Sequence, residues 1–486
     1  MAGSETVSSE KQAHETSLSA TSYLLRDITP FRLKLLLTAI VILAILFSLV
    51  TKSCVEQHRK AAKIVGLDAA PSVIVAHQIK TGVEAMDAAL ADELLYPPGQ
   101  NEGRHMLSDF EESRLNVSKA LVAAAKNITN GKGEEVPIEN LQVSFGQLLM
   151  ESQYARALHN LGKDKEAVAA YAACLRTVTE RLLPNADALM QNNSAVLEDA
   201  YKSEKGSSAM ARGLVMVVGI LLTLLLFYTQ YFLSVRFHRR LNLYLIIVTA
   251  CALLFLQKTS SALADSSTQL KVAKQDAYDS VVALLAARSD AYQANAAESR
   301  WLLDRDYADQ HQKEFVTEMA KVASFEKGHD FGETIAHARK ELANHEKFSL
   351  PGFKGLLADE LANIRFPEEG EAAIETLARF ADYSAVDARI RSLENSSKNA
   401  DAIQLALGYF PGASNYEFHR FDDALERAYK INQDHMTSSI TEAFNNLEGL
   451  IWQSAGFTAI AIVLSYFGIR ARLEEYRWQR YIHKRG

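Results

Sequence analysis

The sequence predicts an all-α membrane protein with four transmembrane helices and two extracytoplasmic antiparallel helical bundles. Four apolar runs, residues 33–50, 213–235, 241–257 and 449–469, are each long enough to cross a hydrocarbon core of about 30 Å as a helix. Long polar segments lie between the first and second runs and between the third and fourth runs. Both segments are rich in Ala, Leu, Glu, Lys and Gln and have apolar residues at helical spacing, which favours bundles of about four helices.

Basic residues near the apolar runs predict the side of the membrane on which each segment lies. The short turn between the second and third runs contains Arg236, Arg239 and Arg240, and the chain after residue 469 is also rich in Arg. Lys and Arg in short loops mark the cytoplasmic face. The basic residues that follow the first run indicate the opposite orientation, but the two other clusters agree with each other. We therefore expect both termini in the cytoplasm and both polar segments outside.

This reasoning divides the chain into nine segments. No Gly or Pro separates residues 256–284 or residues 436–447, so we expect outer helices to continue directly from the third and into the fourth span. The predicted segments are a cytoplasmic tail (1–32), span one (33–50), bundle one (51–212), span two (213–235), a cytoplasmic basic turn (236–240), span three (241–257), bundle two (258–448), span four (449–469) and a cytoplasmic basic tail (470–486).

Composition excludes some classes of function. The chain has 52 Lys plus Arg against 59 Asp plus Glu, a net charge of −7, and neither polar segment contains a basic patch with interleaved aromatic residues. Nucleic-acid binding is therefore not expected. Cys54, Cys174 and Cys251 are too few for a disulfide framework, although a Cys54–Cys174 bridge is conceivable.

The two polar segments also resemble each other in sequence. Residues 72–76 are similar to residues 280–284, and at the same offset residues 94–95 match residues 302–303. Ala-rich helices produce such matches by chance, but here their order agrees with the repeated membrane layout. The sequence therefore predicts an internal duplication.

Motifs that would indicate an enzyme or a cofactor are missing from the sequence. It contains no Gly-rich phosphate loop, no nucleophile elbow and no Cys/His cluster with zinc spacing. The best metal candidate is Glu333, His337, Glu341 and His345, which would share one stripe of a helix. A solvated helix face with charge pairs between neighbouring turns is the favoured interpretation of this ladder. We therefore expect no catalytic residues, no cofactor and no metal.

Charged residues within apolar helices are the first candidates for a binding site. Arg300 lies beside Trp301, and Asp387, Arg389 and Arg391 share another helix. The planar guanidinium group suits a carboxylate ligand at a seam between helices. The alternative is an internal ion pair, in which Arg300 contacts an acid of a neighbouring helix.

A loop and the C-terminal tail are candidate contact surfaces. Turn residues surround two aromatic side chains in residues 408–415, so Tyr409, Phe410 and Asn415 either contact a partner or pack onto the bundle. The tail interleaves Arg with aromatic residues, which indicates an interfacial anchor on anionic lipid or a docking site for a cytoplasmic protein. Its candidate residues are Arg472, Arg477, Trp478, Arg480 and Tyr481.

Four stretches of the second polar segment point to a known family. They are residues 295–303 (NAAESRWLL), 355–361 (GLLADEL), 383–391 (YSAVDARIR) and 412–415 (GASN) followed by Phe421-Asp422. On these stretches the chain resembles the four-span GlnX-type membrane proteins of actinobacteria. The resemblance implies a protein that links an external solute-binding lipoprotein for acidic amino acids to a cytoplasmic Ser/Thr kinase.

The layout favours a non-enzymatic protein of the cell membrane that relays an external signal. Helices that pass from an outer bundle through a membrane can transmit piston or rotation movements. Fewer than about 60 residues are expected in the cytoplasm, too few for a catalytic output domain. A partner would then supply the output, and the layout is also compatible with a homodimer. The alternatives are a structural scaffold or an accessory subunit of a transporter.

Overall fold

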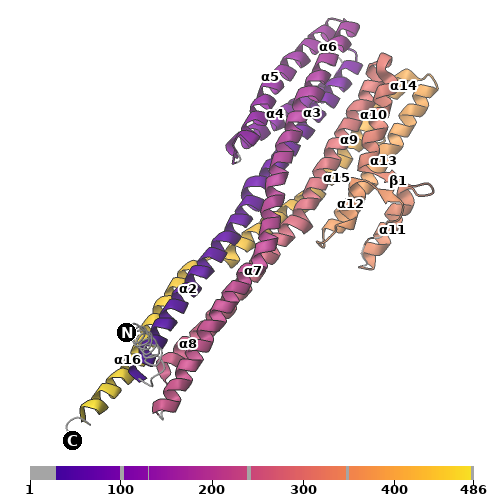
Figure 1. Cartoon of the computed structure of the whole chain (residues 1–486). Helices are drawn as coiled ribbons and strands as arrows, with labels where there is room; N and C mark the ends of the chain where they lie inside the picture. Colours follow the sequence, from indigo (N-terminus) through magenta and orange to yellow (C-terminus); the bar gives the residue numbers. More distant parts are fainter. Residues whose placement is uncertain are drawn as a thin grey trace, which may run out of the picture. The chain divides into compact units, whose positions relative to one another are not determined.

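Helices make up almost all of the structure, a computed structural model that describes residues 29–98, 103–129, 131–237, 242–345, 348 and 350–482 (Figure 1). The two short strands pair antiparallel, with Ser324 opposite Lys354. In chain order the elements are α2 (Thr29–Lys63), η1 (Ile64–Ala69), α3 (Ala70–Leu95), α4 (Gly103–Lys126), α5 (Lys132–Asn160), α6 (Asp164–Thr177), η2 (Val178–Leu182), α7 (Leu183–Phe237), α8 (Leu243–Lys271), η3 (Val272–Tyr278), α9 (Asp279–Leu303), η4 (Arg305–Tyr307), α10 (Ala308–Val322), β1 (Ser324–Phe325), α11 (Phe331–Ala343), β2 (Phe353–Lys354), α12 (Leu356–Ala362), α13 (Glu369–Asn395), α14 (Asn399–Leu407), α15 (Ser414–Asn446) and α16 (Leu450–Ile482).

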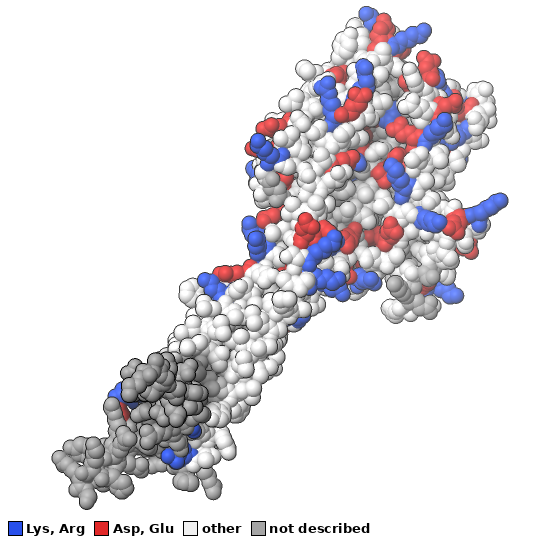
Figure 2. All heavy atoms as spheres, viewed as in Figure 1, with Lys and Arg blue, Asp and Glu red and all other residues white. Residues whose placement is uncertain are grey.

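The first of two compact units contains the apolar runs. Its described parts are residues 29–58, 206–237, 242–265 and 446–482. Four helical stretches in the described chain are long and apolar enough to cross a membrane, which supports a multi-pass membrane protein. Inside this unit the ring of Phe47 on α2 packs edge-on against Phe255 of α8, at a centroid distance of 5.6 Å. Figure 2 shows that the exposed surface around these runs is largely uncharged.

The second unit contains the helices of both polar segments. It comprises residues 59–205, called the first half here, and residues 266–445, the second half. Where the sequence suggests two separate bundles, one buried cluster of the structure spans both halves, while another lies within the first half. Val73 of α3, Leu284 of α9 and Phe421 of α15 belong to the same buried cluster. The two halves associate because α3 and α9 each bury almost their whole circumference, so each must pack against more than its own half.

Helical continuity agrees with the sequence prediction at span three and differs from it at span four. The stretches Thr29–Leu95, Asp164–Arg236 and Leu243–Leu303 are uninterrupted helix, with π-helical turns at η1, η2 and η3. The prediction that α15 continues directly into span four is wrong. A turn ends α15 at Asn446, because Gly449 adopts a left-handed conformation with φ of 72° before α16 begins.

Several local contacts recur in the two halves. Asn127 Nδ2 donates a hydrogen bond of 2.9 Å to Ser72 Oγ, and Asn363 Nδ2 donates one of the same length to Ser280 Oγ. The π-helical turns η1 and η3 precede α3 and α9 respectively. In addition, the guanidinium of Arg156 stacks over the Phe110 ring, as that of Arg391 stacks over the Phe315 ring. The two halves therefore share several local contacts.

The close approach of α3 and α4 should make Gly82 intolerant of a side chain. A Cβ atom at Gly82 would lie 2.5 Å from Cγ2 of the buried Val117, whose β-branched side chain is stiff. We expect Gly82→Ala to lower the free energy of unfolding by about 1–3 kcal/mol, the usual cost of overpacking. Thermal unfolding of the purified full-length protein, followed by circular dichroism, measures this change.

Gly146 on α5 is the matched control for this substitution. No atom lies within 4 Å of a Cβ built there, so Gly146→Ala should stabilise the helix by about 0.5–1 kcal/mol. Equal responses to Gly82→Ala and Gly146→Ala would contradict the packing of α3 against α4.

Candidate functional site at the interface of the two halves

Acidic side chains of the first half are buried against the second half. Glu84, Asp87 and Asp92 lie on α3 and are each at most 6% exposed. Their partners lie mainly on α9, where Glu298 and Arg300 are also buried. Buried charges are costly unless they are paired and hydrogen-bonded. The partners of each buried charge in this interface are therefore described in turn.

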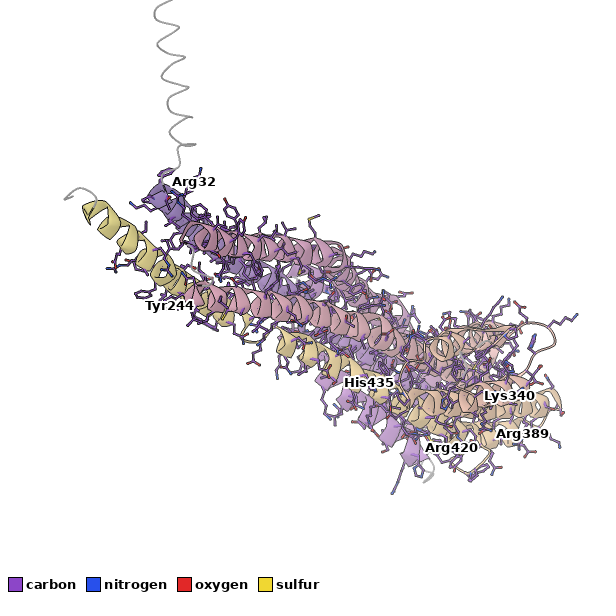
Figure 3. The ribbon with its side chains drawn as sticks, turned by 90° about the horizontal axis from the view of Figure 1, so that it is seen from below. Arg32, Tyr244, Lys340, Arg389, Arg420 and His435 are labelled. Carbon is purple, nitrogen blue, oxygen red and sulfur yellow. The ribbon has the colours of Figure 1, made fainter. Side chains whose placement is uncertain are left out.

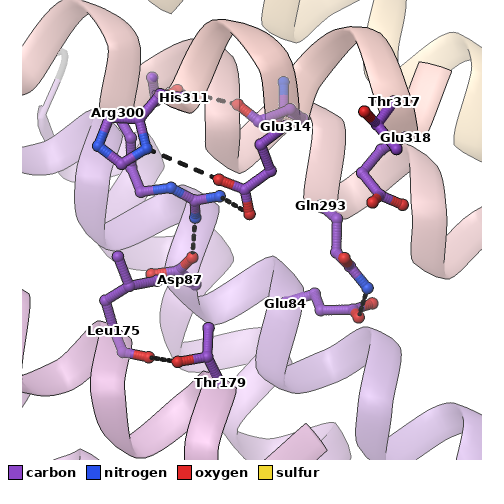
Figure 4. A network of polar contacts seen from close by, with 12 residues as sticks. Glu84, Asp87, Leu175, Thr179, Gln293, Arg300, His311, Glu314, Thr317 and Glu318 are labelled. Carbon is purple, nitrogen blue, oxygen red and sulfur yellow. Dashed lines mark hydrogen bonds and ion pairs between the residues drawn. The ribbon is translucent and has the colours of Figure 1, made fainter. Parts of the chain in front are cut away.

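Arg300 forms the central contact of this interface (Figure 4). Its Nη1 atom pairs with Asp87 Oδ2, and its Nη2 atom lies 2.8 Å from Glu314 Oε1 on α10. Tyr171 of α6 donates a hydrogen bond of 2.7 Å to the other oxygen of Asp87. His311 Nδ1 lies 3.6 Å from Glu314 Oε2. One guanidinium thus connects side chains from four helices, and it is the internal ion pair that the sequence left as an alternative.

The electrostatics of this cluster combine burial with pairing. Burial raises the pKa of the Asp87 carboxyl, against the opposing effect of Arg300. Burial also disfavours the charge of Arg300, but Asp87 and the neighbouring groups raise its pKa. For Glu314, burial is outweighed by His311 and Arg300, which together lower its pKa. The guanidinium is therefore charged at any relevant pH and compensated by carboxylates of both halves.

A second cluster lies around Asp92. Ser299 Oγ of α9 donates a hydrogen bond to Asp92 Oδ1, and Asn415 Nδ2 of α15 donates one of 2.8 Å to Asp92 Oδ2. Burial raises the pKa of Asp92 to about 6. Nearby, Ser414 Oγ donates to Glu298 Oε1 at 2.9 Å. Asn415, a candidate partner contact from the sequence, is thus buried between the halves.

Glu84 is the least satisfied of the three acids. Gln293 Nε2 of α9 donates a hydrogen bond of 2.6 Å to Glu84 Oε1, while Glu84 Oε2 is buried with no hydrogen-bond partner. Burial raises the pKa of Glu84 to about 8, despite the opposing charge of Lys80. The carboxyl is therefore mostly protonated at neutral pH.

The loop at residues 408–415 is divided between the inside and the surface. Tyr409 OH donates a hydrogen bond to Asp109 of α4, and the Tyr409 ring stacks on His105 at 5.1 Å. Phe410, by contrast, is 46% exposed. Of the three candidate residues in this loop, Tyr409 and Asn415 therefore contact the first half, and Phe410 is exposed to solvent.

The acid and two arginines of α13 form a separate group. Arg391 Nε lies 2.9 Å from Asp387 Oδ2, and the guanidinium of Arg391 lies over the rings of Trp301 and Phe315. Arg389 is exposed at the surface of the unit, where Nη1 lies 3.4 Å from the carbonyl oxygen of Gly412 (Figure 3). The structure does not bring Arg389 into a site with Arg300.

The remaining candidates from the sequence have different outcomes. Arg472 lies on α16, while the side chains of the other tail candidates (Arg477, Trp478, Arg480 and Tyr481) lie outside the described residues. The metal ladder is not formed, because α11 ends at Ala343 and His345 follows it with φ of 56°. His337 Nε2 instead lies 3.2 Å from Glu341 Oε1. No disulfide joins Cys54 to Cys174 in the described structure, so the conceivable bridge between them is not formed.

Sequence reasoning singled out Arg300 but missed its partners on α3. Glu84, Asp87 and Asp92 interrupt an otherwise apolar helix, and acids at such positions are almost never fully buried unless paired. Acids within an otherwise apolar helix were the sequence pattern from which these buried residues could have been predicted. Tyr171 and Glu314 had no such signal, because each becomes part of the cluster only through the packing of α6 and α10.

Comparison with known proteins finds one similarity, in the first half. Residues 61–202 match the family described as Actinobacterial sensor domain. No curated protein and no solved structure matches the chain. The matched segment differs from residues 280–430, which carry the resemblance to GlnX-type proteins. Together with the four apolar helices, the match supports a sensor-type actinobacterial membrane protein.

Removal of Arg300 should strand a buried carboxylate. We expect Arg300→Ala to lower the free energy of unfolding by about 3–5 kcal/mol, because Asp87 would remain buried without a cation. Arg389→Ala is the control, since that side chain is exposed and its loss should change stability by less than about 0.5 kcal/mol. Thermal unfolding of the full-length protein in detergent measures both. Similar melting temperatures for the two variants would show that the ion pair does not hold the interface.

Glu84 should make stability depend on pH. Its folded-state pKa of about 8 exceeds the ordinary value of 4.5, so the folded state binds more protons than the unfolded state. The protonated Glu84 carboxyl contributes its full stabilisation at pH values below the ordinary pKa, and this contribution is lost as the pH rises through about 8. Glu84→Gln keeps a neutral hydrogen-bonding group, so its melting temperature should fall less between pH 5 and pH 8 than that of the wild type.

The exposed Glu139 on α5 is the control for the pH experiment. Glu139→Gln should leave the difference in melting temperature between the two pH values unchanged. If Glu84→Gln behaves in the same way as Glu139→Gln, protonation of Glu84 does not contribute to the pH dependence.

Proposed function

We propose that this protein is a non-enzymatic membrane sensor that relays an extracytoplasmic signal to a cytoplasmic partner. The observation that carries the proposal is the sensor-domain match over residues 61–202, which lies between two of the apolar runs. The proposed orientation places the second unit outside the membrane and the turn at residues 236–240 and the tail at residues 470–486 inside. The distribution of Lys and Arg supports this orientation.

The relay would use the interface between α3 and α9. Each of these helices belongs to an uninterrupted helical stretch that also contains an apolar run. A ligand that changes how the two halves pack would favour one arrangement of α3 against α9 over another. Small shifts of packed helices are a known way to transmit such a change. The buried polar contacts of Arg300 and Asp92 would then define the resting arrangement.

We infer that the two halves arose by duplication of one unit. The equivalent hydrogen bonds of Asn127 and Asn363 support this, because their acceptors Ser72 and Ser280 correspond in the sequence repeat. The π-helical turns before α3 and α9 support it as well. After duplication the two copies diverged, so that acids lie on one side of the interface and Arg300 on the other.

The proposed partners are an extracytoplasmic solute-binding protein and a cytoplasmic Ser/Thr kinase or another output protein. The resemblance over residues 280–430 suggests both. Membrane lipid is the third expected contact, through the apolar helices and the basic tail.

A pull-down from cross-linked native membranes tests the relay. The intact chain should recover an external and a cytoplasmic protein, and a chain that ends at Arg470 should recover the external one alone. Arg300→Ala, where it still folds, should reduce recovery of the cytoplasmic protein while the external one is kept, because the interface no longer defines one arrangement. Quantitative mass spectrometry measures both recoveries. Partners that are indifferent to the tail and to Arg300 would instead favour a structural scaffold or a transporter subunit.

A further inference from the structure

A stripe of large hydrophobic side chains runs along the exposed face of α5 and is called the α5 stripe here. Its members are between 49% and 73% exposed, and they are Val136, Val143, Met150, Tyr154 and Leu161, which directly follows the helix. Successive members are seven, seven, four and seven residues apart. Because each residue of an α-helix advances by about 100°, this spacing places all five within about 40° of one another and along about 38 Å of helix.

The opposite face of α5 belongs to the core of the first half. Ile138, Leu141, Phe145 and Leu148 are buried there in one cluster with residues of α3, α4 and α6. Figure 1 shows α5 at the margin of the second unit, beside α6. The α5 stripe is therefore not used in the packing of the helix, and no segment of the described chain covers it.

The exposed side of α5 also lacks charge along most of its length. From residue 140 to residue 160, none of the exposed residues of α5 is charged. By contrast, the exposed residues of α4 include Arg104, Glu112, Lys119 and Lys126. A helix face that remains in water is normally polar and charged. A face that is both hydrophobic and uncharged indicates contact with another macromolecule.

The matching helix of the second half has no such stripe. The stacking of a guanidinium over an aromatic ring involves Arg156 of α5 and Arg391 of α13, so these helices have similar places in their halves. The exposed residues of α13 include Glu371, Asp382 and Arg389, and no large hydrophobic residue of α13 is exposed. The α5 stripe is therefore a feature of the first half and not of every helix at this place in the fold.

The spacing of the α5 stripe fits a second helix, and its lack of charge fits a second copy of this chain. Hydrophobic residues seven and four positions apart form the seam of paired helices, in which side chains of one helix insert between those of the other. An uncharged face can meet its own copy without repulsion between like charges, whereas it has no charge with which to select a different protein. All copies in one membrane have the same orientation, so identical faces can meet around a two-fold axis.

The area of the α5 stripe is sufficient for a specific contact. The exposed parts of its five residues amount to roughly 600 Å² per copy, so a symmetric contact would bury about 1,200 Å², at the lower end of the range for specific interfaces. The apolar helices hold both copies in one membrane, which raises their effective concentration and favours a contact of this size.

We propose that the α5 stripe pairs with the α5 stripe of a second copy and so forms a symmetric homodimer. Met150 lies near the middle of the stripe. It would therefore lie opposite Met150 of the other copy, or within one helical turn of it, whether the two helices run parallel or antiparallel. The contact is independent of the relay proposed above, because it involves neither Arg300 nor the interface between the halves.

Cysteine cross-linking of the full-length chain in cell membranes tests the proposal. A short bismaleimide should join two copies that carry Met150→Cys and give a product of twice the mass of the chain. Val316→Cys is the control, because Val316 is 55% exposed on α10, outside the α5 stripe, and should give at most a tenth of that yield. The wild type, which keeps its own three cysteines, measures the background.

Equal yields of the double-mass product from Met150→Cys and Val316→Cys would overturn the proposal. A product in which Met150→Cys is joined to a different protein, in place of the dimer, would overturn it as well and would assign the stripe to that protein. A dimer without a tail-dependent cytoplasmic partner would retain this contact and refute the relay.

Charge substitutions within the stripe give a second measurement in the Met150→Cys background. Val143→Glu combined with Tyr154→Glu should lower the cross-linking yield at least about tenfold, because like charges would meet in either helix order. Val316→Glu should leave the yield unchanged. Val143→Lys combined with Tyr154→Lys should also abolish the product, and co-expression of the Glu and Lys chains should restore it. A yield that is insensitive to these charges, or that co-expression does not restore, contradicts the homodimer.

Discussion

The buried contact between Arg300 and Asp87 is the interaction on which the outer unit depends. It joins α9 of the second half to α3 of the first, with Tyr171 and Glu314 completing the shell. Burying a guanidinium and a carboxylate costs free energy that their attraction only partly offsets, but leaving either one alone costs far more. The pair therefore acts less as a source of stability than as a condition on how α3 and α9 pack against each other.

The other buried acids make this interface more polar than one formed by apolar side chains alone. Asp92 accepts hydrogen bonds from the neutral groups of Ser299 and Asn415, and Glu298 and Glu84 accept them from Ser414 and Gln293 respectively. Such contacts are directional, so they select one register of α3 against α9, yet each contributes little net free energy. An interface of this kind can exchange one arrangement for another at modest cost, which a sensor requires.

The segment that matches the sensor-domain family packs against the second half at this interface. The sensor-domain match over residues 61–202 contains the acids of α3, and residues 280–430 contain Arg300 and Asn415. The contacts that recur in the two halves suggest that they began as equivalent copies. In this interface the acids lie mainly on α3 and their partners mainly on α9.

The sequence alone determined the class of the protein and much of its helix pattern. Runs of apolar residues and helical periodicity are local properties, so the four membrane-crossing helices and the extent of α3 could be read directly. Arg300 was also recognisable, as a charge in an apolar helix. Its partners were not, because Asp87, Tyr171 and Glu314 are 213, 129 and 14 positions away in the chain and meet only when α3, α6 and α10 pack around α9. The tertiary structure likewise decided that both halves form one unit, since long-range packing and the desolvation of charge depend on which surfaces meet.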